Sequence, residues 1–176
     1  MFGILQGEVP AEHLEGVNDF INDRVDHGFY VPQAIATPGG PRLILEQRAC
    51  YMVEADLRVG LTMTIDSIVQ RYMKEMEIVG QAVVVESQFL SNPVGGGVEL
   101  HTDDFKATIQ YPRHIISMTY FNSDFVGGEL FFPKSNVRIT PRPGLVAVFD
   151  SRNPHTVAPL IQGRRNAMQR SYTIFK

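Results

Sequence analysis

Tryptophan is absent from this sequence of 176 residues, and cysteine occurs once, as Cys50. A single cysteine cannot form a disulfide within the chain, so the fold has to rest on a packed apolar core. Because Cys50 lies in a mostly apolar stretch, we expect it to be an ordinary buried residue. A chain of this length is about one domain, which can bury such a core without disulfides or structural metals.

Long apolar runs are also missing. No stretch approaches the ~20 apolar residues of a membrane-spanning helix, and no basic segment followed by an apolar run indicates a signal peptide. The 16 basic and 19 acidic residues give a net charge of −3, which supplies no general attraction for nucleic acid or an anionic membrane. We therefore expect a soluble, cytoplasmic protein without nucleic-acid or membrane partners.

The first part of the chain carries two helical patterns. Apolar residues recur at helical spacing from Val9 to Val25, and Gly28 follows as a plausible stop. A second apolar stripe, from Leu61 to Met76, predicts an amphipathic helix whose methionines fill the core. Between these helices, the short apolar runs at 29–32 and 42–46 indicate strands or extended loops.

After Gly80 the pattern changes to short apolar segments separated by turns rich in glycine and proline. The segments that we interpret as strands are residues 82–90, 115–121, 129–132, 136–139, 145–149 and 170–175. Many short strands at regular spacing indicate a sandwich or barrel, and two preceding helices would cover one sheet face. The sequence thus predicts a mainly β, jelly-roll-like core flanked by N-terminal helices. We expect a single domain over 1–176, with helical support over about 1–80 and the β core over about 81–176.

Two of the five histidines lie beside turn-rich segments of the β part, where functional groups tend to be displayed on a rigid scaffold. His101 and Asp103 are two residues apart, so in an extended stretch both side chains point to the same side. His155 follows the strand at 145–149. Asp104 is less favoured as a metal ligand, because in a strand it points to the opposite side.

Two imidazoles and one carboxylate form a facial triad that leaves coordination positions open. This set suits non-haem Fe(II), whose open positions admit a cosubstrate and O₂. A structural zinc site is more often closed by four ligands that include several cysteines, whereas a catalytic zinc ion with open positions would fit the same residues. A His-x-Asp pair by itself is a weak signal, because it occurs often by chance.

The segments around the triad follow one another in an order that is specific as a combination. They are His101–Asp104, Ile115–Asn122, Phe125–Pro133, Pro141–Asp150 and Pro154–Pro159. From about Ala82 to the C-terminus, the chain resembles the Fe(II)/2-oxoglutarate-dependent dioxygenases, and the branch that it resembles is the prolyl 4-hydroxylase-like one.

The resemblance implies a double-stranded β-helix of cupin-like shape, with His101, Asp103 and His155 as Fe(II) ligands. It implies that 2-oxoglutarate and O₂ take the open positions of the metal. Decarboxylation of the cosubstrate to succinate and CO₂ would then accompany hydroxylation of an unactivated C–H bond. Ascorbate is an optional further cofactor, and the implied substrate is a peptide, a protein or a free amino acid.

Members of this family hold the far carboxylate of 2-oxoglutarate with a basic residue shortly after the distal histidine. An arginine can grip a carboxylate through two parallel, charge-assisted hydrogen bonds. Family spacing favours Arg165. The strand pattern favours Arg170, which we prefer because the segment 164–169 reads as a loop, and Arg164 is the third candidate.

Further candidates rest on weaker signals. Tyr120 and Thr119 lie on a strand that in this family faces the cosubstrate, so either hydroxyl could bind it, although a packed tyrosine explains Tyr120 equally well. The glycine pair at 127–128 is expected to form a tight turn. The loop at 92–97 either flanks the substrate entrance or is a plain connection, and His114 is expected to be structural or solvated.

The leading function is therefore that of a 2-oxoglutarate-dependent hydroxylase. The main alternative is a cupin-like metal-binding protein without oxygenase activity, which would need no buried arginine facing the site. A degenerate family member that serves as an interaction protein and a hydrolytic zinc enzyme are weaker alternatives. The sequence indicates neither the individual substrate nor the oligomeric state.

Overall fold

The computed structural model describes residues 3–32, 35–37, 40–42, 50–54, 58–104 and 111–176. Within these ranges, the larger sheet has the strand order β1 (Ile4–Glu8), β12 (Leu145–Asp150), β8 (Ile115–Tyr120), β15 (Arg165–Phe175), β6 (Gln81–Asn92), β5 (Tyr51–Glu54) and β2 (Val31–Pro32). The smaller sheet has the order β11 (Val137–Ile139), β10 (Leu130–Phe132), β13 (His155–Val157) and β7 (Val98–His101). Two short two-stranded sheets pair β9 (Val126–Gly127) with β14 (Leu160–Gln162) and β3 (Ile35–Thr37) with β4 (Gly40–Arg42).

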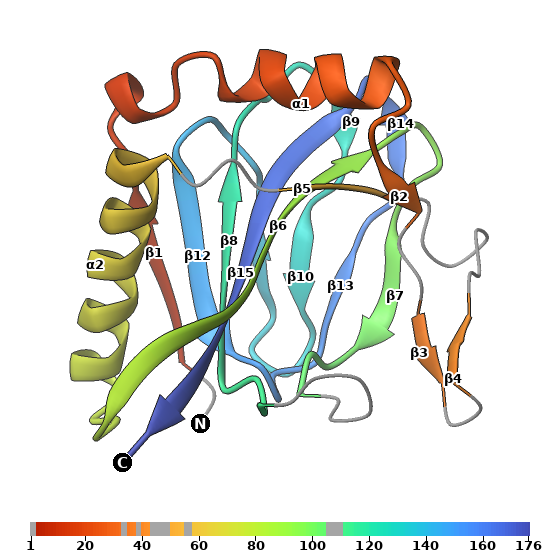
Figure 1. Cartoon of the computed structure of the whole chain (residues 1–176). Coiled ribbons are helices and arrows are strands. Elements are labelled where there is room, and N and C mark those ends of the chain that lie inside the picture. Colours follow the sequence, from red (N-terminus) through yellow and green to blue (C-terminus); the bar gives the residue numbers. More distant parts are fainter. Residues whose placement is uncertain (1–2, 33–34, 38–39, 43–49, 55–57, 105–110) are drawn as a thin grey trace.

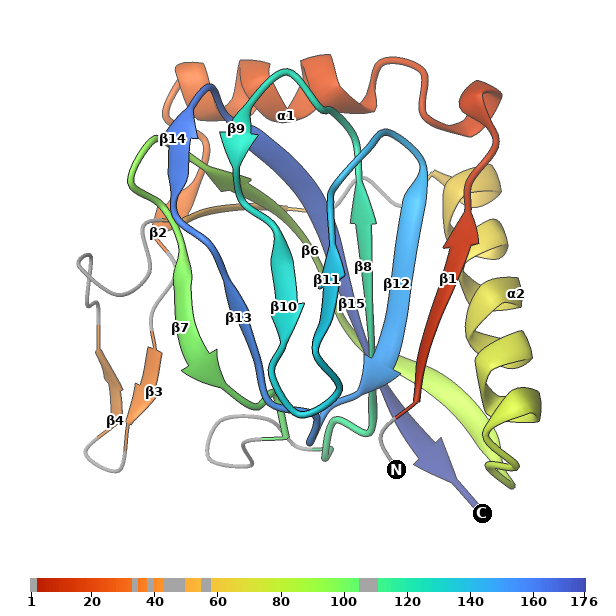
Figure 2. The ribbon, with the colours of Figure 1, turned by 180° about the vertical axis from the view of Figure 1, so that it is seen from behind.

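The two main sheets are antiparallel and lie face to face, as the front and back views show (Figures 1 and 2). The fold is a double-stranded β-helix, and this part of the sequence-based expectation is confirmed. One apolar layer, which includes Tyr120, Phe132 and Phe149, fills the space between the sheets. A second layer packs the outer face of the larger sheet against the helices. Because apolar layers cover both faces of β8 and β12, the sequences of these two strands are nearly continuous apolar runs.

Both helices lie on the outer face of the larger sheet (Figure 1). The helix α2 (Val59–Glu75) buries the predicted apolar stripe, including Leu61 and Ile65. The other predicted helix is shorter than expected. A 3₁₀ turn at Ala11–His13 comes first, and α1 (Val17–Asp26) begins only after Gly16. Gly16 adopts a left-handed conformation with φ of 69°, which interrupts a continuous helix.

The first 80 residues are not only helical, which corrects the predicted division of the chain. The strand β1 pairs with β12 along its whole length, and β5 and β2 extend the opposite edge of the same sheet. Of the apolar runs predicted here, 29–32 contains β2, whereas residues 43–46 lie outside the described residues. Cys50 is 3% exposed, as expected for a buried thiol. In the described part of the chain, no helix is long and apolar enough to cross a membrane.

The predicted β strands are confirmed at β6, β8, β10, β11 and β12. The last strand was predicted to begin at Arg170, with a loop over 164–169, and this prediction is wrong. The strand β15 begins at Arg165, because it pairs with β6 from Arg165 onward and with β8 from Ala167 onward. The two neighbouring strands supply hydrogen-bond partners that the local sequence does not reveal.

Candidate metal and cosubstrate site

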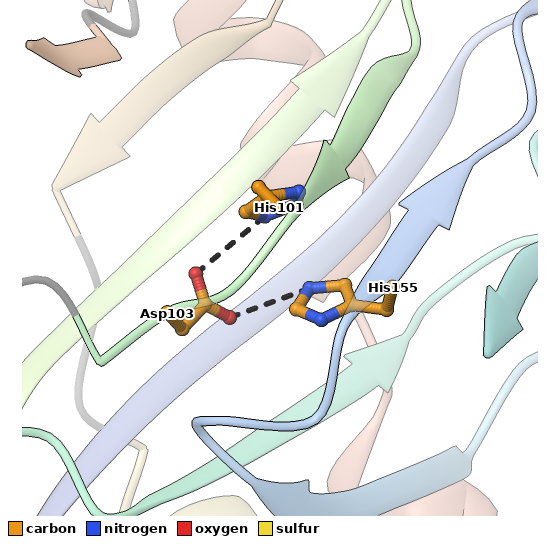
Figure 3. A group of neighbouring side chains, drawn as sticks. All are labelled: His101, Asp103 and His155. Atoms are coloured by element: carbon orange, nitrogen blue, oxygen red, sulfur yellow. Dashed lines mark ion pairs between the residues drawn. The ribbon is translucent and has the colours of Figure 1, made fainter. Parts of the chain in front are cut away.

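Three predicted metal ligands converge at one end of the space between the sheets. His101 ends β7 and His155 begins β13, and the two are direct partners in the antiparallel ladder. Asp103 follows the end of β7, where its backbone N–H donates a 2.7 Å hydrogen bond to the carbonyl of Ser151. This contact holds the carboxylate between both imidazole rings (Figure 3). The prediction that these three side chains meet is confirmed.

The distances within the triad suit a single metal ion. Nε2 of His101 lies 3.6 Å from Oδ1 of Asp103, and Nε2 of His155 lies 3.4 Å from Oδ2 of the same carboxylate. One potential ligand atom from each residue lies within 4.8 Å of the others. Ligand atoms about 2.0–2.2 Å from a shared ion lie at most about 4.4 Å apart, so both His–Asp distances already suit one ion.

Both imidazoles are oriented by the nitrogen that faces away from the triad. Nδ1 of His101 hydrogen-bonds to the carbonyl of Glu99 at 2.8 Å, and Nδ1 of His155 hydrogen-bonds to the carbonyl of Asn153 at 2.9 Å. A carbonyl only accepts, so in each neutral ring the proton lies on Nδ1 and the Nε2 lone pair faces Asp103. Histidine ligands of metal sites are commonly fixed in this way. The donor set therefore fits a divalent transition metal.

The surroundings of the triad are largely apolar on the side of His155. This ring is 4% exposed and lies against Phe149 and Phe132, at centroid distances of 4.9 Å and 5.7 Å. Asp103 is 7% exposed, whereas His101 is less deeply buried. Packing on one side leaves the open coordination positions to face the adjoining pocket.

The pocket next to the triad has a volume of about 390 Å³, its open mouth included. Besides the triad, most of the lining is apolar, contributed by Cys50, Leu90, Val98, Met118, Leu130 and Val157. The remaining polar groups are Arg165, Asn92 and Gln169. A mostly apolar wall with a few polar groups is typical of a ligand site.

Arg165 is the strongest polar feature of this pocket. It is 1% exposed. Its Nη1 donates to the carbonyl of Gly128 at 2.9 Å, and its Nη2 donates to Oδ1 of Asn92 at 2.8 Å. Burial lowers the pKa of the guanidinium, partly offset by Tyr120 and Cys50 nearby. Among the described residues no carboxylate pairs with this charge, so the pocket holds a buried cation that favours an anionic ligand.

Gly128 allows the close approach of this arginine. Its φ is +76°, and a Cβ at this position would lie 3.2 Å from Cδ of Arg165. Gly127, with φ of +87°, similarly passes close to the carbonyl of Pro159. The predicted turn role of the glycine pair is thus joined by a second one, because the carbonyl of Gly128 orients the buried guanidinium.

Arg170, the preferred candidate of the sequence analysis, points away from the pocket. Its Nη1 donates to Oδ1 of Asp66 at 2.8 Å and to the carbonyl of Thr62 at 3.0 Å, both in α2. Side chains alternate along a strand, so residues 165 and 170, five positions apart, lie on opposite faces of β15. The preference for Arg170 is therefore corrected. Arg164 is also directed elsewhere, because it forms an ion pair with Asp26 at 2.8 Å.

Tyr120 and Thr119, the two hydroxyl candidates, are neighbours in β8, so their side chains point to opposite faces of the sheet. Tyr120 faces the space between the sheets and is fully buried, and its hydroxyl has no hydrogen-bond partner among the residues that the structure describes. Its ring lies 5.9 Å from the guanidinium carbon of Arg165, and burial raises the pKa of its phenol. Thr119 pairs with Met168 and Val146, which face the helices. Thr119 thus lies on the wrong face to reach the pocket.

Three pocket groups were missed by the sequence analysis: Asn92, Gln169 and the carbonyl of Gly128. Gln169 shares the pocket-facing side of β15 with Arg165, four residues earlier, and Asn92 is the direct strand partner of Arg165. The alternation of β15 would have indicated Gln169 if the strand had been started at Arg165. His114 is structural as expected, because its Nδ1 accepts the backbone N–H of Ile174 at 2.9 Å.

The fold and the triad define a class of proteins: double-stranded β-helices with two histidines and one carboxylate that hold a metal beside a ligand pocket. Residues 87–172, which include every residue of the triad and Arg165, match the model of the 2OG-Fe(II) oxygenase superfamily. This match and the shared fold support a 2OG-Fe(II) oxygenase with a prolyl hydroxylase-like fold.

Solved prolyl hydroxylases share the fold over nearly the whole chain. A prolyl-4-hydroxylase from Pseudomonas putida is 18% identical with a TM-score of 0.73, covering 99% of this chain and 94% of that chain. A Trichoplax adhaerens prolyl hydroxylase, in complex with a hypoxia inducible factor peptide fragment, is 20% identical with a TM-score of 0.79, covering 98% and 83%. A viral collagen prolyl hydroxylase from Paramecium Bursaria Chlorella virus-1, solved as a 2OG complex, is 15% identical with a TM-score of 0.67, covering 99% and 96%.

Curated relatives match over a shorter segment. Prolyl 3-hydroxylase 3 of Homo sapiens is 40% identical over 63 residues, which cover 32% of this chain and 9% of that protein. The protein of the same name from Mus musculus is 38% identical over 63 residues, with the same coverage. The match thus spans about a tenth of the length of these relatives.

Proposed function

We propose that this chain is an Fe(II)- and 2-oxoglutarate-dependent dioxygenase that hydroxylates a side chain of a peptide substrate. The observation that carries the proposal is a pairing within one pocket. A facial triad lies in the pocket wall, and Arg165, which pairs with no carboxylate of the described residues, is buried in the same wall. 2-Oxoglutarate has two carboxylates. The one beside its keto group would bind the metal on the triad, and the one at the far end would bind Arg165.

His101, Asp103 and His155 would hold the iron, which supplies O₂ activation at its open positions when bound. The carbonyls of Glu99 and Asn153 keep both Nε2 atoms directed at the ion. The apolar wall around His155 limits the access of water to the site. Loss of any one ligand would leave two, so His101→Ala or Asp103→Ala should abolish succinate production with little loss of fold.

Arg165 would grip the far carboxylate of 2-oxoglutarate, with Tyr120 as an additional donor. Gly128 and Asn92 occupy both terminal nitrogens of the guanidinium, each through one hydrogen bond, and each nitrogen has a second N–H to offer. Because burial raises the pKa of Tyr120, its phenol stays protonated and can donate. A charge-assisted pair in a dry pocket is stronger than the same pair in water.

Peptides are the favoured substrate class. Support comes from similar structures, which include a hydroxylase bound to a peptide fragment and a collagen prolyl hydroxylase. A free amino acid is the second candidate. A panel of proline-containing peptides and amino acids should be screened for substrate-stimulated succinate release. Stimulation by an amino acid but by no peptide would contradict the assignment.

A cupin-like metal-binding protein without oxygenase activity is the weaker reading. Such a protein needs no buried arginine at its pocket, and the superfamily match does not favour it. Anaerobic addition of Fe(II) and 2-oxoglutarate separates the two. We expect a weak visible charge-transfer band and, after admission of O₂, succinate. Absence of both from folded, iron-loaded protein would contradict the oxygenase assignment.

Two further expectations remain proposals. We propose that residues 1–176 act as one domain, since β1 at one end of the chain and β15 at the other belong to the same sheet. The cytoplasmic location also stays a prediction from the sequence, as does the lack of nucleic-acid and membrane partners.

A further inference from the structure

The helix α1 contacts β15 on both sides of Arg165. Nδ2 of Asn166 donates two hydrogen bonds, each 2.8 Å long, to Oδ1 of Asn18 and Oδ1 of Asn22 in α1. On the other side, Nη1 of Arg164 pairs with Asp26 of the same helix. Figure 1 shows α1 crossing the end of the sheet at which β15 begins. The helix is therefore fastened to the residues that immediately flank the cosubstrate arginine.

Buried partners fix Asn166 from the sheet as well. Its Oδ1 accepts a 2.7 Å hydrogen bond from the hydroxyl of Ser91 in β6. Its backbone N–H donates to Oδ1 of Asn122 at 2.9 Å, and Nδ2 of Asn122 donates to the carbonyl of Arg164. Asn166 and Ser91 are both 0% exposed. With one acceptor and two donors satisfied in the side chain, the network specifies one orientation of the Asn166 amide.

The two faces of the strand pair are linked at this point. Asn166 pairs with Ser91 on the helix-facing side, and the next pair along, Arg165 with Asn92, lies on the pocket side. The hydrogen bond between Ser91 and Asn166 thus fixes the register of the pair that carries Arg165 and its partner Asn92. Strand ends fray when their partners are few, and Arg165 is the first residue of β15.

We propose that Asn166 is a positioning residue, and that α1, through Asn18 and Asn22, sets the affinity of the pocket for the far carboxylate of its cosubstrate. This inference rests on the proposed function. The helix does not line the pocket. It acts by holding the first residues of β15 in register with β6. The guanidinium of Arg165 is thereby kept in the geometry that hydrogen bonds to both oxygens of a carboxylate require.

The test uses a double variant, Asn18→Ala with Asn22→Ala, which removes both α1 acceptors of the Asn166 amide and leaves the sequence of β15 unchanged. Oδ1 of Asn22 also accepts from Nη1 of Arg164 at 3.4 Å, and Asp26 keeps Arg164 paired with α1 in the variant. Protein loaded with Mn(II), a redox-inert substitute for iron, is titrated with 2-oxoglutarate by calorimetry, and Mn(II) affinity is measured separately. Coupling of this kind changes affinity by roughly 2- to 30-fold. We expect the dissociation constant for 2-oxoglutarate to rise within that range, while the Mn(II) affinity stays at the wild-type value.

Two further variants distinguish positioning from a general loss of stability. Asp66→Ala removes the ion pair of α2 with Arg170, which lies on the same face of the same strand as Asn166. It should lower the melting temperature at least as far, yet keep wild-type affinity for 2-oxoglutarate. Asn18→Asp with Asn22→Asp retains an acceptor oxygen at both positions and should restore tight binding. Circular dichroism checks that each variant is folded, and the single variant Asn22→Ala replaces the double one if the latter unfolds.

The outcomes separate this inference from the proposed function. Wild-type affinity in the folded double variant, or equal weakening by Asp66→Ala, would overturn the positioning role while leaving the oxygenase assignment intact. Wild-type protein that carries Mn(II) and binds no 2-oxoglutarate would overturn both.

Discussion

Replacing Arg165 by methionine should remove the grip on 2-oxoglutarate and leave the metal triad intact. Methionine keeps an unbranched apolar stem in a position that is 1% exposed, but it carries no charge and no donors. A hydrogen bond that involves a charged group contributes about 1.5–3 kcal/mol. Loss of two such bonds amounts to about 3–6 kcal/mol, so the dissociation constant should rise roughly 10²- to 10⁴-fold.

The stability of the unliganded variant should change little, because two effects oppose each other. Methionine relieves the desolvation of a buried charge that has no carboxylate partner among the described residues. It also leaves the carbonyl of Gly128 and Oδ1 of Asn92 without the donors that they have in the wild-type protein, at a cost of about 1–3 kcal/mol per buried group.

Ligand-dependent unfolding gives the assay. At a 2-oxoglutarate concentration 100 times its wild-type dissociation constant, binding stabilises the native state by about 2.7 kcal/mol. A variant with 10²-fold weaker binding gains about 0.4 kcal/mol under the same conditions. In a domain of this size, 1 kcal/mol corresponds to about 2–4 °C. The Mn(II)-loaded wild type should therefore melt about 5–11 °C higher with 2-oxoglutarate, and the variant about 1–2 °C higher.

Arg170→Met is the matched control, since it removes an arginine from the same strand. It leaves Asp66 of α2 without its ion pair, so the variant should be destabilised but should keep the full ligand-induced shift. The reasoning is refuted if Arg165→Met retains the wild-type shift, and more so if Arg170→Met loses it.

Three other predictions follow from single contacts. Tyr120→Phe should weaken 2-oxoglutarate binding roughly 10- to 150-fold, the value of one hydrogen bond to a charged group. It should not destabilise the unliganded protein, because the hydroxyl has no partner among the described residues; calorimetric titration that shows unchanged affinity would exclude this tyrosine from the grip. Gly128→Ala should cost about 1–2 kcal/mol in urea denaturation, because its φ of +76° disfavours a side chain, and it should also weaken 2-oxoglutarate binding by crowding Arg165; an unaffected variant would contradict both effects. Burial raises the pKa of Asp150, but hydrogen bonds and the charge of Arg152 outweigh it and hold that pKa below its usual value, so this carboxylate stabilises the fold above its unfolded-state pKa and the contribution is lost as the pH falls through the lowered value. In Arg152→Gln this contribution is lost, so the variant should be less stable than the wild type above the unfolded-state pKa of Asp150, and the difference should close as the pH falls through the lowered value. A difference in urea midpoints that stays the same at every pH would count against the argument.

The metal triad could be predicted from the sequence because its geometry is local. Two residues of spacing put His101 and Asp103 on one side of an extended segment, and His155 follows a strong strand. The sequence does not show that the segment with His101 lies beside the segment with His155. In the structure, the antiparallel pairing of β7 with β13 brings them together by making the two histidines direct partners.

The arginine could not be chosen correctly, because the choice depends on where β15 begins. The segment 164–169 is polar and does not alternate between apolar and polar residues, so local propensity gives a loop. Pairing with two neighbouring strands overrides that propensity. Because side chains alternate along the strand from Arg165 onward, Arg165 points into the pocket and Arg170 points toward α2. The strand β1 was missed for a similar reason, since its role as an edge strand is set by its partner β12.

The central claim is that one pocket holds a metal on the triad and the far carboxylate of 2-oxoglutarate on Arg165. Crystals grown anaerobically with Fe(II) and 2-oxoglutarate test it most directly, through anomalous diffraction at the iron edge. We predict a single iron peak about 2.0–2.2 Å from Nε2 of His101, Nε2 of His155 and one oxygen of Asp103, with the far carboxylate against the Arg165 guanidinium. Iron bound elsewhere, or 2-oxoglutarate held by Arg170, would contradict the account.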